Sequence, residues 1–427
     1  MNKLNLTGVL IVIIFLIGCT PKSLRQGNSY IENGEYPQAL EVLTDALNNN
    51  PDNPKIHRSL GIAYYKTGQY EQALDEFEKA KQKLDDDGII MFYSGLSFEQ
   101  LAQYDRAIEE YSNYVRLGRF SSIRSKLRQR VQQLIPKQAA QWAKDRMKTE
   151  KEINPVDIPD NSIAVAYFKP LNISEELRSL HIGLTDLLIL DLSMIKSLRV
   201  IERVKLKEIY EELGFSTTDF VDENTTPRMG KLLGASSLVT GVFTGFGDEQ
   251  WRIDPALGWI KLDDYMTLES VEGKLQQFFA VEKELVFDVL ENLDITVTEE
   301  EKNQIMNNIP TKSLKAFLAY SRGLDYVDRG MYSEAISEFE SALTIDPGFN
   351  ISGAKMANAK LLSQSMDSTN RLEEVFDSAI LLAEEKNQLM ITTLENTSQA
   401  GLTRSPKSEL AFSEAQSDVE LEILFQW

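Results

Sequence analysis

One cysteine and two histidines are the side chains that most readily suggest chemistry here, and their positions disfavour catalysis. His57 occupies a repeat position that ordinarily holds a large packing residue. His181 begins an expected helix and has no neighbouring serine. A single thiol and two distant histidines do not support a zinc site. No glycine-rich phosphate loop with its lysine is present. We therefore expect a protein that is not an enzyme and has no cofactor and no metal.

The cysteine, Cys19, follows an apolar run over residues 10–18 that comes after the positive charge of Lys3. This run is shorter than the roughly 20 apolar residues of a membrane-spanning helix. Its layout is typical of a secretory signal with a small residue before the cleavage site. A cysteine in that place resembles the bacterial lipobox, whose thiol becomes diacylated. We expect residues 1–18 to be a signal peptide and Cys19 to be lipidated; an ordinary signal peptide is the alternative.

Composition agrees with an envelope protein anchored by lipid. The formal net charge of -20 argues against nucleic acid, because phosphate binding depends on Lys and Arg. Lipidation would use the only thiol, which leaves no disulfide. Thr20 stands where an aspartate retains many lipoproteins in the inner membrane. The expected location is therefore the periplasmic face of the outer membrane, with the inner membrane as the alternative.

A period of 34 residues follows, set by Gly27, Gly61 and Gly95. Four further columns keep this interval: Tyr30, Tyr64 and Phe98; Tyr36, Tyr70 and Tyr104; Ala39, Ala73 and Ala107; Leu43, Phe77 and Tyr111. Small residues where helices cross, with aromatics around them, resemble the tetratricopeptide repeat. The third unit departs from the pattern at Tyr114, which fits a capping role.

Tetratricopeptide arrays bind extended peptides or partner helices in a concave groove. Only Asn28 matches the chaperone-type carboxylate clamp, so we reject that ligand. A mixed aromatic and basic groove favours an acidic peptide or helix, and packing between repeats is the alternative role for its aromatics. The expected groove residues are Asn28, Arg58, Ile62, Tyr65, Lys66, Phe92 and Leu96, with Arg58, Tyr65, Lys66 and Phe92 contributing most.

Basic residues crowd the stretch from Arg116 to Lys148, which carries a helical apolar stripe at Leu127, Val131, Leu134 and Ile135. We expect this helix to cap the array and to complete a domain over residues 19–150. Its basic face is either solvated or in contact with anionic lipid or an acidic partner.

Beyond a linker at residues 154–160, the pattern changes to alternating strands and helices, which predicts an α/β layer domain over residues 155–300. We expect strands at 162–168, 198–202 and 237–243, two more over 250–261 and 265–271, and helices at 180–195, 204–213, 227–233 and 275–293.

The order of short motifs in this region resembles the CsgG-type domain of curli-secretion lipoproteins, whose layout flagellar outer-membrane lipoproteins and TolB-N-terminal-like domains share. The resemblance covers residues 161–298 and rests on the segments 163–165, 183–186, 198–203, 230–235, 238–241 and 271–275. It implies a periplasmic assembly domain that packs into rings. A pore is not expected, because residues 237–271 leave no room for added transmembrane strands of about 9–11 residues each. The family usually has an uninterrupted strand where this chain has Pro255 and Gly258, so a hairpin starting at Gln250 is not predicted with certainty by the resemblance.

Another tetratricopeptide unit closes the folded region, with Gly323, Tyr332, Ala335, Phe339 and Pro347 at the offsets of the first repeat. One unit cannot bury its faces alone, so we expect it to pack on helices at 351–393 or on the middle domain. This region is assigned to residues 311–395. Residues 396–427 are expected to form a loose tail ending in one strand that pairs with a sheet edge.

The expected fold class is α plus α/β: a tetratricopeptide array, a CsgG-like layer domain and a second short tetratricopeptide region. The expected function is a periplasm-facing outer-membrane lipoprotein that acts as a protein-interaction scaffold in envelope assembly or secretion. Its partners would be envelope proteins or peptides, the membrane through the anchor, and further copies of this chain through the CsgG-like domain. A component of a curli-type secretion complex is the alternative.

Overall fold

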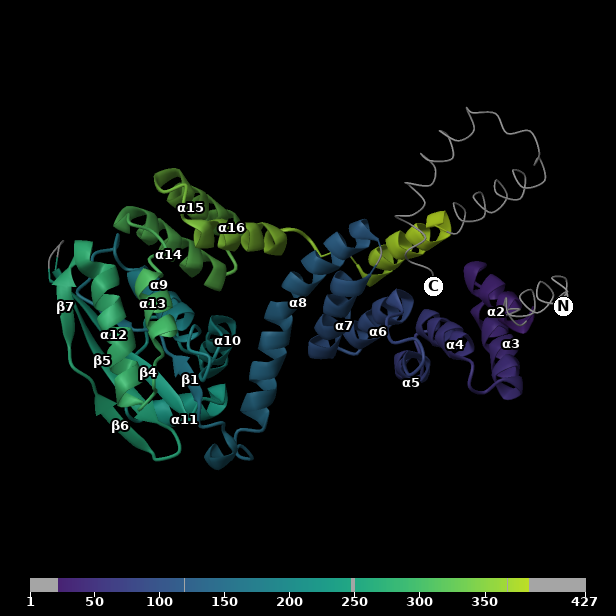
Figure 1. Ribbon diagram of the computed structural model, residues 1–427, viewed down its shortest axis with the longest axis horizontal. Helices are drawn as coiled ribbons and strands as arrows, with labels where there is room; N and C mark the ends of the chain where they lie inside the picture. Colours follow the sequence, from purple (N-terminus) through teal and green to yellow (C-terminus); the bar gives the residue numbers. More distant parts are fainter. Residues whose placement is uncertain (1–21, 119, 247–249, 367, 384–427) are drawn as a thin grey trace, which may run out of the picture. The chain divides into compact units, whose positions relative to one another are not determined.

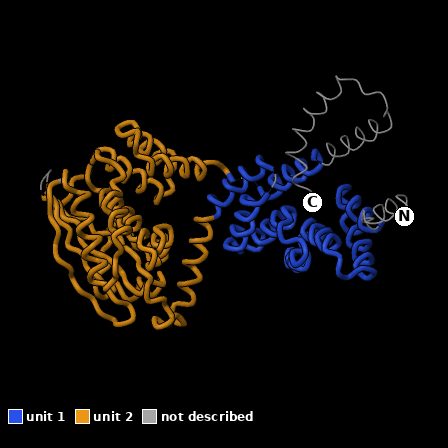
Figure 2. Tube along the Cα trace, in the orientation of Figure 1, with its two compact units in different colours: residues 1–134, 366–427 blue, residues 135–365 orange. Residues whose placement is uncertain are grey.

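The structure is a computed structural model that describes residues 22–118, 120–246, 250–366 and 368–383. It forms two compact units, coloured separately in Figure 2: residues 1–134 with 366–427, and residues 135–365. The expected signal peptide, Cys19 and the C-terminal tail lie outside the described residues. Those assignments, and the domain boundaries given above, stay predictions.

Pairs of helices build the first unit (Figure 1). In chain order they are α2 (Lys22–Glu32), α3 (Tyr36–Asn49), α4 (Pro54–Lys66), α5 (Tyr70–Lys81), α6 (Gly88–Gln100) and α7 (Tyr104–Leu117). The long α8 (Ser121–Lys148) follows, and Ile123, Leu127 and Leu134 from its first half are buried in the same core as α6 and α7. The first half of α8 therefore covers the end of the array, as a capping helix should.

The repeated glycines lie where two helices of a pair touch. A Cβ atom added at Gly61 would collide with the ring of Phe77, and the pairs Gly27–Leu43 and Gly95–Tyr111 repeat the arrangement. The large side chain stands sixteen residues after each glycine and is almost fully buried. The 34-residue period thus records a close helix crossing filled by one large side chain.

Side-chain caps fix where two groove helices begin. Asn53 Oδ1 accepts the amide hydrogen of Lys55 at 3.0 Å at the start of α4, and Pro54 follows as the first helical residue. Asp87 Oδ1 accepts from the amides of Ile89 and Ile90 at 2.9 and 3.2 Å at the start of α6.

A further helix, residues 369–383, belongs to the first unit although it lies far along the chain. Its side chains Leu372 and Phe376 are buried at 2% and 1% exposure in one core with Phe92 and Leu96.

The second unit is built around a mixed seven-stranded sheet. Its strands are β1 (Ser162–Val165), β2 (Lys169–Leu171), β3 (Arg199–Val200), β4 (Ser237–Phe246), β5 (Gln250–Trp259), β6 (Asp264–Thr267) and β7 (Val271–Lys274). The main order is β3-β1-β4-β5-β6, with β2 beside β4 and β7 beside β5. Strands β1, β2, β3 and β4 pair in parallel, whereas β5 pairs antiparallel with β4, β6 and β7. The strand β4 is buried over its first five residues.

Helices accompany this sheet and complete its core. They are α9 (Leu180–Leu192), α10 (Arg203–Leu213), α11 (Thr226–Leu233), α12 (Phe278–Asn292) and α13 (Glu299–Asn307), with short 3-10 turns η1 (Pro155–Asp157) and η2 (Leu275–Gln277). Leu184 and Leu188 from α9 and Leu285 from α12 are buried with the strand residues in one cluster.

The hairpin from Gln250, left open above, is present as β4 paired with β5 along ten residues each. Pro255 lies opposite Gly241 in this register, at the point where β5 changes its other neighbour from β7 to β6. Proline cannot donate to a ladder, so it is tolerated where the pairing is interrupted. Its carbonyl still accepts from the amide of Leu268 at 2.9 Å.

The second tetratricopeptide region comprises α14 (Leu314–Asp328), α15 (Tyr332–Ile345) and α16 (Asn350–Ser363). A Cβ atom at Gly323 would collide with Phe339, which repeats the crossing of the first array. Helix α14 also packs on α9, where Gly183 lies against Ser321 and Phe317. The unit therefore uses both supports that the sequence suggested, α16 and the middle domain.

The fold class expected from the sequence is confirmed: a helical array, a mixed sheet region with helices, and further helices. None of the helices among the described residues combines the length and the apolar character needed to cross a membrane.

Candidate functional site

A groove lined by α4 and α6 of the first unit holds the 369–383 helix. We call these wall residues, Tyr65, Lys66, Phe92, Tyr93 and Leu96, the N-terminal groove. Because the residues facing inward from successive first helices line one concave surface, they can act together on a single bound segment.

The side chains of Tyr65, Lys66 and Tyr93 each donate from the wall of the N-terminal groove to a carboxylate on the helix. Lys66 pairs with Glu373, and its Nζ donates to Asp377 Oδ2 at 2.7 Å. The Tyr65 hydroxyl donates to Glu373 Oε2 at 3.2 Å, and the Tyr93 hydroxyl donates to Asp377 Oδ1 at 2.5 Å. Both carboxylates are therefore paired with donors from the groove wall.

An aromatic cluster provides the apolar part of the contact. The ring of Phe376 stacks on Phe92 with centroids 3.7 Å apart and planes at 10°. Tyr93 and Tyr114 meet the same ring edge-on at 6.0 and 5.8 Å. Aromatic pairs of this kind contribute about 0.5–1.5 kcal/mol each beyond the area they bury.

Charge states in the groove suit an acidic ligand. Burial alone would lower the pKa of Lys66, but Asp377 and Glu373 outweigh it and the pKa is raised. Burial raises the pKa of Tyr93 and of Tyr65, and the carboxylates of Asp377 and Glu373 add to this effect. At neutral pH the groove therefore presents one ammonium and two hydroxyl donors.

The other groove residues expected from the sequence support the wall. Arg58 Nη1 donates to Asp87 Oδ2 at 2.6 Å, so its charge pairs with the residue that caps α6. Ser59 Oγ donates to Asn28 Oδ1 at 2.7 Å, which links the first two repeats. Ile62 packs against the core of this unit, and Leu96 is fully buried within it.

Sequence reasoning missed Tyr93, Gln100 and the packing of the 369–383 helix: helices were expected over residues 351–393, but as support for the second tetratricopeptide unit, whereas this helix packs in the first unit. Gln100 Nε2 donates to Thr369 Oγ1 at 2.6 Å near the start of that helix. A signal was present in the sequence: Leu372 and Phe376, and likewise Glu373 and Asp377, are four residues apart and share a helical face.

Two of the basic residues in α8 make structural contacts. Arg130 pairs with Glu99, with its Nε donating to Oε2 at 2.9 Å. Arg146 donates from Nε and Nη2 to the carbonyl oxygens of Leu232 and Lys231 at 2.9 and 2.6 Å. These two side chains therefore fix α8 locally, within the first and the second unit respectively.

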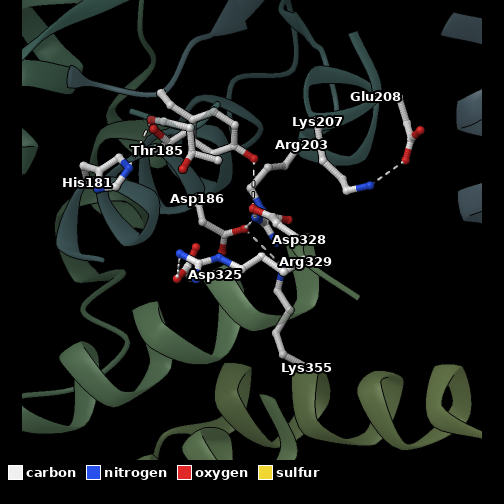
Figure 3. Close-up of polar contacts among 12 residues, drawn as sticks. His181, Thr185, Asp186, Arg203, Lys207, Glu208, Asp325, Asp328, Arg329 and Lys355 are labelled. Carbon is white, nitrogen blue, oxygen red and sulfur yellow. Dashed lines mark hydrogen bonds and ion pairs between the residues drawn. The ribbon is translucent and has the colours of Figure 1, made fainter. Parts of the chain in front are cut away.

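A second cluster of charges lies in the second unit, where α9, α10, α14 and α16 meet (Figure 3). Asp186 Oδ1 accepts from Arg203 Nε at 3.0 Å and from Lys355 Nζ at 3.1 Å. Arg203 Nη1 also donates to Asp328 Oδ2 at 2.6 Å. Two tyrosine hydroxyls complete the cluster: Tyr320 donates to Asp186 at 2.6 Å and Tyr167 to Asp328 at 3.0 Å.

Every charge in this cluster has an opposite partner. Burial would raise the pKa of Asp186, but Lys355 and Arg203 outweigh it and lower the pKa. Burial raises the pKa of Asp328 despite the guanidinium of Arg203. We interpret the cluster as a clamp between the sheet domain and the second tetratricopeptide region, because both oxygens of Asp186 and Oδ2 of Asp328 already accept hydrogen bonds from the protein.

The two histidines are buried and bound to groups of their own unit. His57 Nδ1 lies 2.6 Å from Glu76 Oε2, and its Nε2 lies 2.8 Å from the carbonyl oxygen of Pro51. Burial lowers the pKa of His181 to about 4. Within the described ranges, no three His, Cys, Asp or Glu side chains are arranged to hold a metal ion.

The repeat geometry and the mixed sheet define a tetratricopeptide protein with an α/β assembly-type domain, and family models agree. Residues 27–68 match a model described as TPR repeat, and residues 54–87 match one described as tetratricopeptide repeat. Residues 134–252 match the model described as curli production assembly/transport component CsgG. The chain thus carries tetratricopeptide repeats followed by a CsgG-type domain, as the sequence motifs indicated. Both are scaffold or transport families.

Solved structures with tetratricopeptide repeats show weak overall similarity. A tetratricopeptide repeat protein from Parabacteroides merdae is 11% identical, with 79% of this chain and 98% of that chain covered, at a TM-score of 0.25. The TPR2AB domain of yeast Sti1, in a complex with pHSP90, is 13% identical, with 80% of this chain and 98% of that chain covered, at a TM-score of 0.25. Yeast Tom70 is 15% identical, with 95% and 76% covered, at 0.26. Comparison with curated proteins gives no match. Similarity at this level adds nothing about function.

Proposed function

We propose that this chain is a lipid-anchored scaffold of the bacterial envelope, on the periplasmic face of the outer membrane, whose N-terminal groove captures helical segments of partner proteins. The observation that carries the proposal is that the groove already holds a helix through a buried aromatic, a buried leucine and two carboxylates. Buried aromatic anchors surrounded by specific polar contacts are typical of binding sites. The chain's residues suggest no catalytic role.

The anchor rests on Cys19 and the apolar run before it. Metabolic labelling with a palmitate analogue should label the wild-type protein and not Cys19→Ala, and the variant should leave the membrane fraction. Labelling and retention that survive this substitution would contradict the anchor.

Partner capture is tested in intact cells by photo-crosslinking from a probe placed at exposed Arg25 on α2. In a chain that carries Leu372→Ala and Phe376→Ala, which free the groove of its own helix, Lys66→Glu should reduce crosslinks to partners by about tenfold, because it removes a charge-assisted hydrogen bond worth roughly 1.5–3 kcal/mol. Lys55→Glu is the matched control, because it makes the same charge change at an exposed position of the same helix. Equal crosslinking by both variants would remove the groove from the proposal.

A second candidate function is a component of a curli-type secretion complex. The match of residues 134–252 to the CsgG model favours it, since that model describes an assembly and transport component. Both candidate functions allow this chain to assemble into rings through the same domain, so ring formation does not distinguish them. Single-channel steps from purified protein in planar bilayers would favour secretion over scaffolding, whereas silent bilayers containing assembled rings would favour the scaffold.

A further inference from the structure

The bound helix shows which chemistry the N-terminal groove recognises. Leu372 and Phe376 are one turn apart and almost fully buried, and Glu373 and Asp377 form the adjacent stripe. Lys66, with its side chain 13% exposed, pairs with both carboxylates. Charge pairs shielded in this way are geometrically specific, because loss of one partner leaves the other buried and unpaired.

The helix makes this contact with one face, on which Val375, Ala379 and Ile380 also pack, partly buried, against the same core. Leu372 and Phe376 are buried, whereas Arg371, Glu374 and Ser378 are exposed. Leu381 and Leu382 are 50% and 59% exposed, so the apolar residues near the end of the helix remain uncovered. A helix of this length is marginal alone in water, so it depends on the groove for its structure.

Only a short stretch of chain joins the 369–383 helix to the element before it. Residues 364–368 connect the end of α16 to the start of this helix. A segment held by a short connection acts at an effective concentration on the order of millimolar. Such a segment occupies the groove in the absence of competitors, yet a free helix of higher affinity or concentration can replace it.

We propose that the N-terminal groove selects acidic amphipathic helices with leucine, glutamate, an aromatic residue and aspartate at positions i, i+1, i+4 and i+5. The chain's own 369–383 helix is the resident occupant, and partner helices bind by displacing it. This proposal rests on the scaffold function and defines the chemistry of its partners. The contacts that would be exchanged are those of Phe376 on Phe92 and of the two carboxylates on Lys66.

The test uses purified full-length protein in detergent micelles and a fluorescent peptide of residues 366–383 with blocked ends. The opened variant carries Leu372→Ala and Phe376→Ala, which remove both apolar anchors and leave the groove wall intact. For an intrinsic dissociation constant of about 10 μM and a millimolar effective concentration, the opened variant should bind the peptide roughly 100-fold more tightly than the wild-type chain. Fluorescence anisotropy measures both affinities.

Matched variants separate displacement from other effects. Glu374→Ala alters an exposed acidic residue of the same helix and should bind the peptide as weakly as the wild type. Glu373→Lys with Asp377→Lys gives a second opened form, because both new charges face Lys66. The peptide should bind this lysine variant tightly as well. The proposal therefore stays testable even if the alanine variant misfolds.

Charge reversal tests the recognition itself. Lys66→Glu in the opened variant should weaken binding of the natural peptide at least about tenfold. A peptide carrying Glu373→Lys and Asp377→Lys should then regain affinity for the reversed groove. Restored binding by the reversed pair supports a specific acid–base contact rather than apolar adhesion.

Several outcomes would overturn the proposal without touching the scaffold function. Equal peptide affinity for the wild-type and opened chains would show that the 369–383 helix does not compete. Absence of binding to both opened forms, with native circular dichroism, would exclude this ligand chemistry. A wild-type dimer that the opened variant dissociates, measured by sedimentation, would show helix exchange between copies. Crosslinking to partners in cells is measured independently and distinguishes failure of the scaffold itself.

Discussion

Glu282 on α12 has both carboxylate oxygens buried without a hydrogen-bond donor. Lys283 Nζ forms an ion pair with Glu282 Oε2 at 3.0 Å and also pairs with Asp191, so one ammonium is shared by two buried carboxylates. Burial raises the pKa of Glu282 well above its ordinary value, and the negative charge of Asp191 raises it further. The folded protein therefore holds the proton on Glu282 more tightly than the unfolded chain does.

This preference gives the stability a defined pH dependence. The folded state retains a proton that the unfolded chain releases above its ordinary pKa of 4.5, so stability falls as pH rises from 4.5 through the raised folded pKa. Glu282→Gln should flatten this decline and stabilise the protein by roughly 1–3 kcal/mol at alkaline pH. Urea unfolding at a series of pH values measures it. Glu284→Gln, exposed on the same helix, should retain the wild-type pH dependence.

At the scale of elements, the crossing of α9 and α14 depends on Gly183. A Cβ atom there would collide with Ser321 and approach the Phe317 ring at 3.1 Å. Gly183→Ala should therefore destabilise the second unit by about 1–3 kcal/mol, the usual cost of overpacking. Gly353→Ala in α16 is the control: its Cβ would meet Leu343 at an ordinary 3.9 Å. Thermal melting should show the control unchanged or slightly more stable, because alanine favours the helix.

The charge clamp joins four elements and gives a second test. Asp186→Ala leaves Arg203 and Lys355 without their shared carboxylate, and removal of one buried partner costs about 3–5 kcal/mol. Hydrogen exchange in α14 and α16 should accelerate in this variant. Arg329→Ala breaks a pair with Asp325 one turn away on the same helix, in which the Arg329 side chain is 59% exposed, and should cost only about 0.3–0.5 kcal/mol. Equal effects of the two substitutions would contradict a clamp.

The repeating elements were predictable because each depends on residues close in sequence. Gly61 meets Phe77 within one helix pair, so a fixed spacing reveals the crossing. Most of the strand and helix order of the middle domain follows from local patterns in the same way, but β2 was not predicted, and the strand expected over 265–271 is two strands, β6 and β7. The contacts in the N-terminal groove and in the charge clamp join residues far apart in sequence, so no local pattern predicts them. Lys66 and Asp377 are 311 residues apart, and Asp186 and Lys355 are 169 apart. Four-residue spacing predicts that residues 372–377 form a two-faced helix, but the surface that receives it is set only by packing.

At the scale of the whole molecule, the first unit is discontinuous in sequence. The chain forms the N-terminal array, continues through the sheet domain and α14 to α16, and then contributes residues from 366 onward to the first unit again. A partner that displaces the 369–383 helix would therefore free a segment joined directly to the second tetratricopeptide region. Under this proposal, occupancy of the groove by a partner would decide whether residues 369–383 remain part of the first unit.

The net charge of the chain also affects the rate at which an acidic helix associates with the N-terminal groove. The chain carries a formal net charge of -20, and the probe peptide of residues 366–383 carries four acidic residues and one basic residue, or -3. Two negatively charged molecules repel each other at long range before local attraction to Lys66 acts. The Debye length shrinks from about 30 Å at 0.01 M salt to about 8 Å at 0.15 M. Salt should therefore remove repulsion at long range while leaving the 2.7 Å contact between Lys66 and Asp377 largely intact.

Association of this peptide with the opened variant should consequently become several-fold faster between 0.01 and 0.15 M salt, the reverse of attraction between opposite charges. Stopped-flow anisotropy separates this rate from dissociation, which should rise only modestly because the Lys66 side chain is 13% exposed. A peptide carrying Asp367→Asn and Glu374→Gln keeps both recognised carboxylates and has a charge of -1, so its association rate should depend little on salt. An association rate that falls with salt for the natural peptide would mean that the basic groove controls the approach.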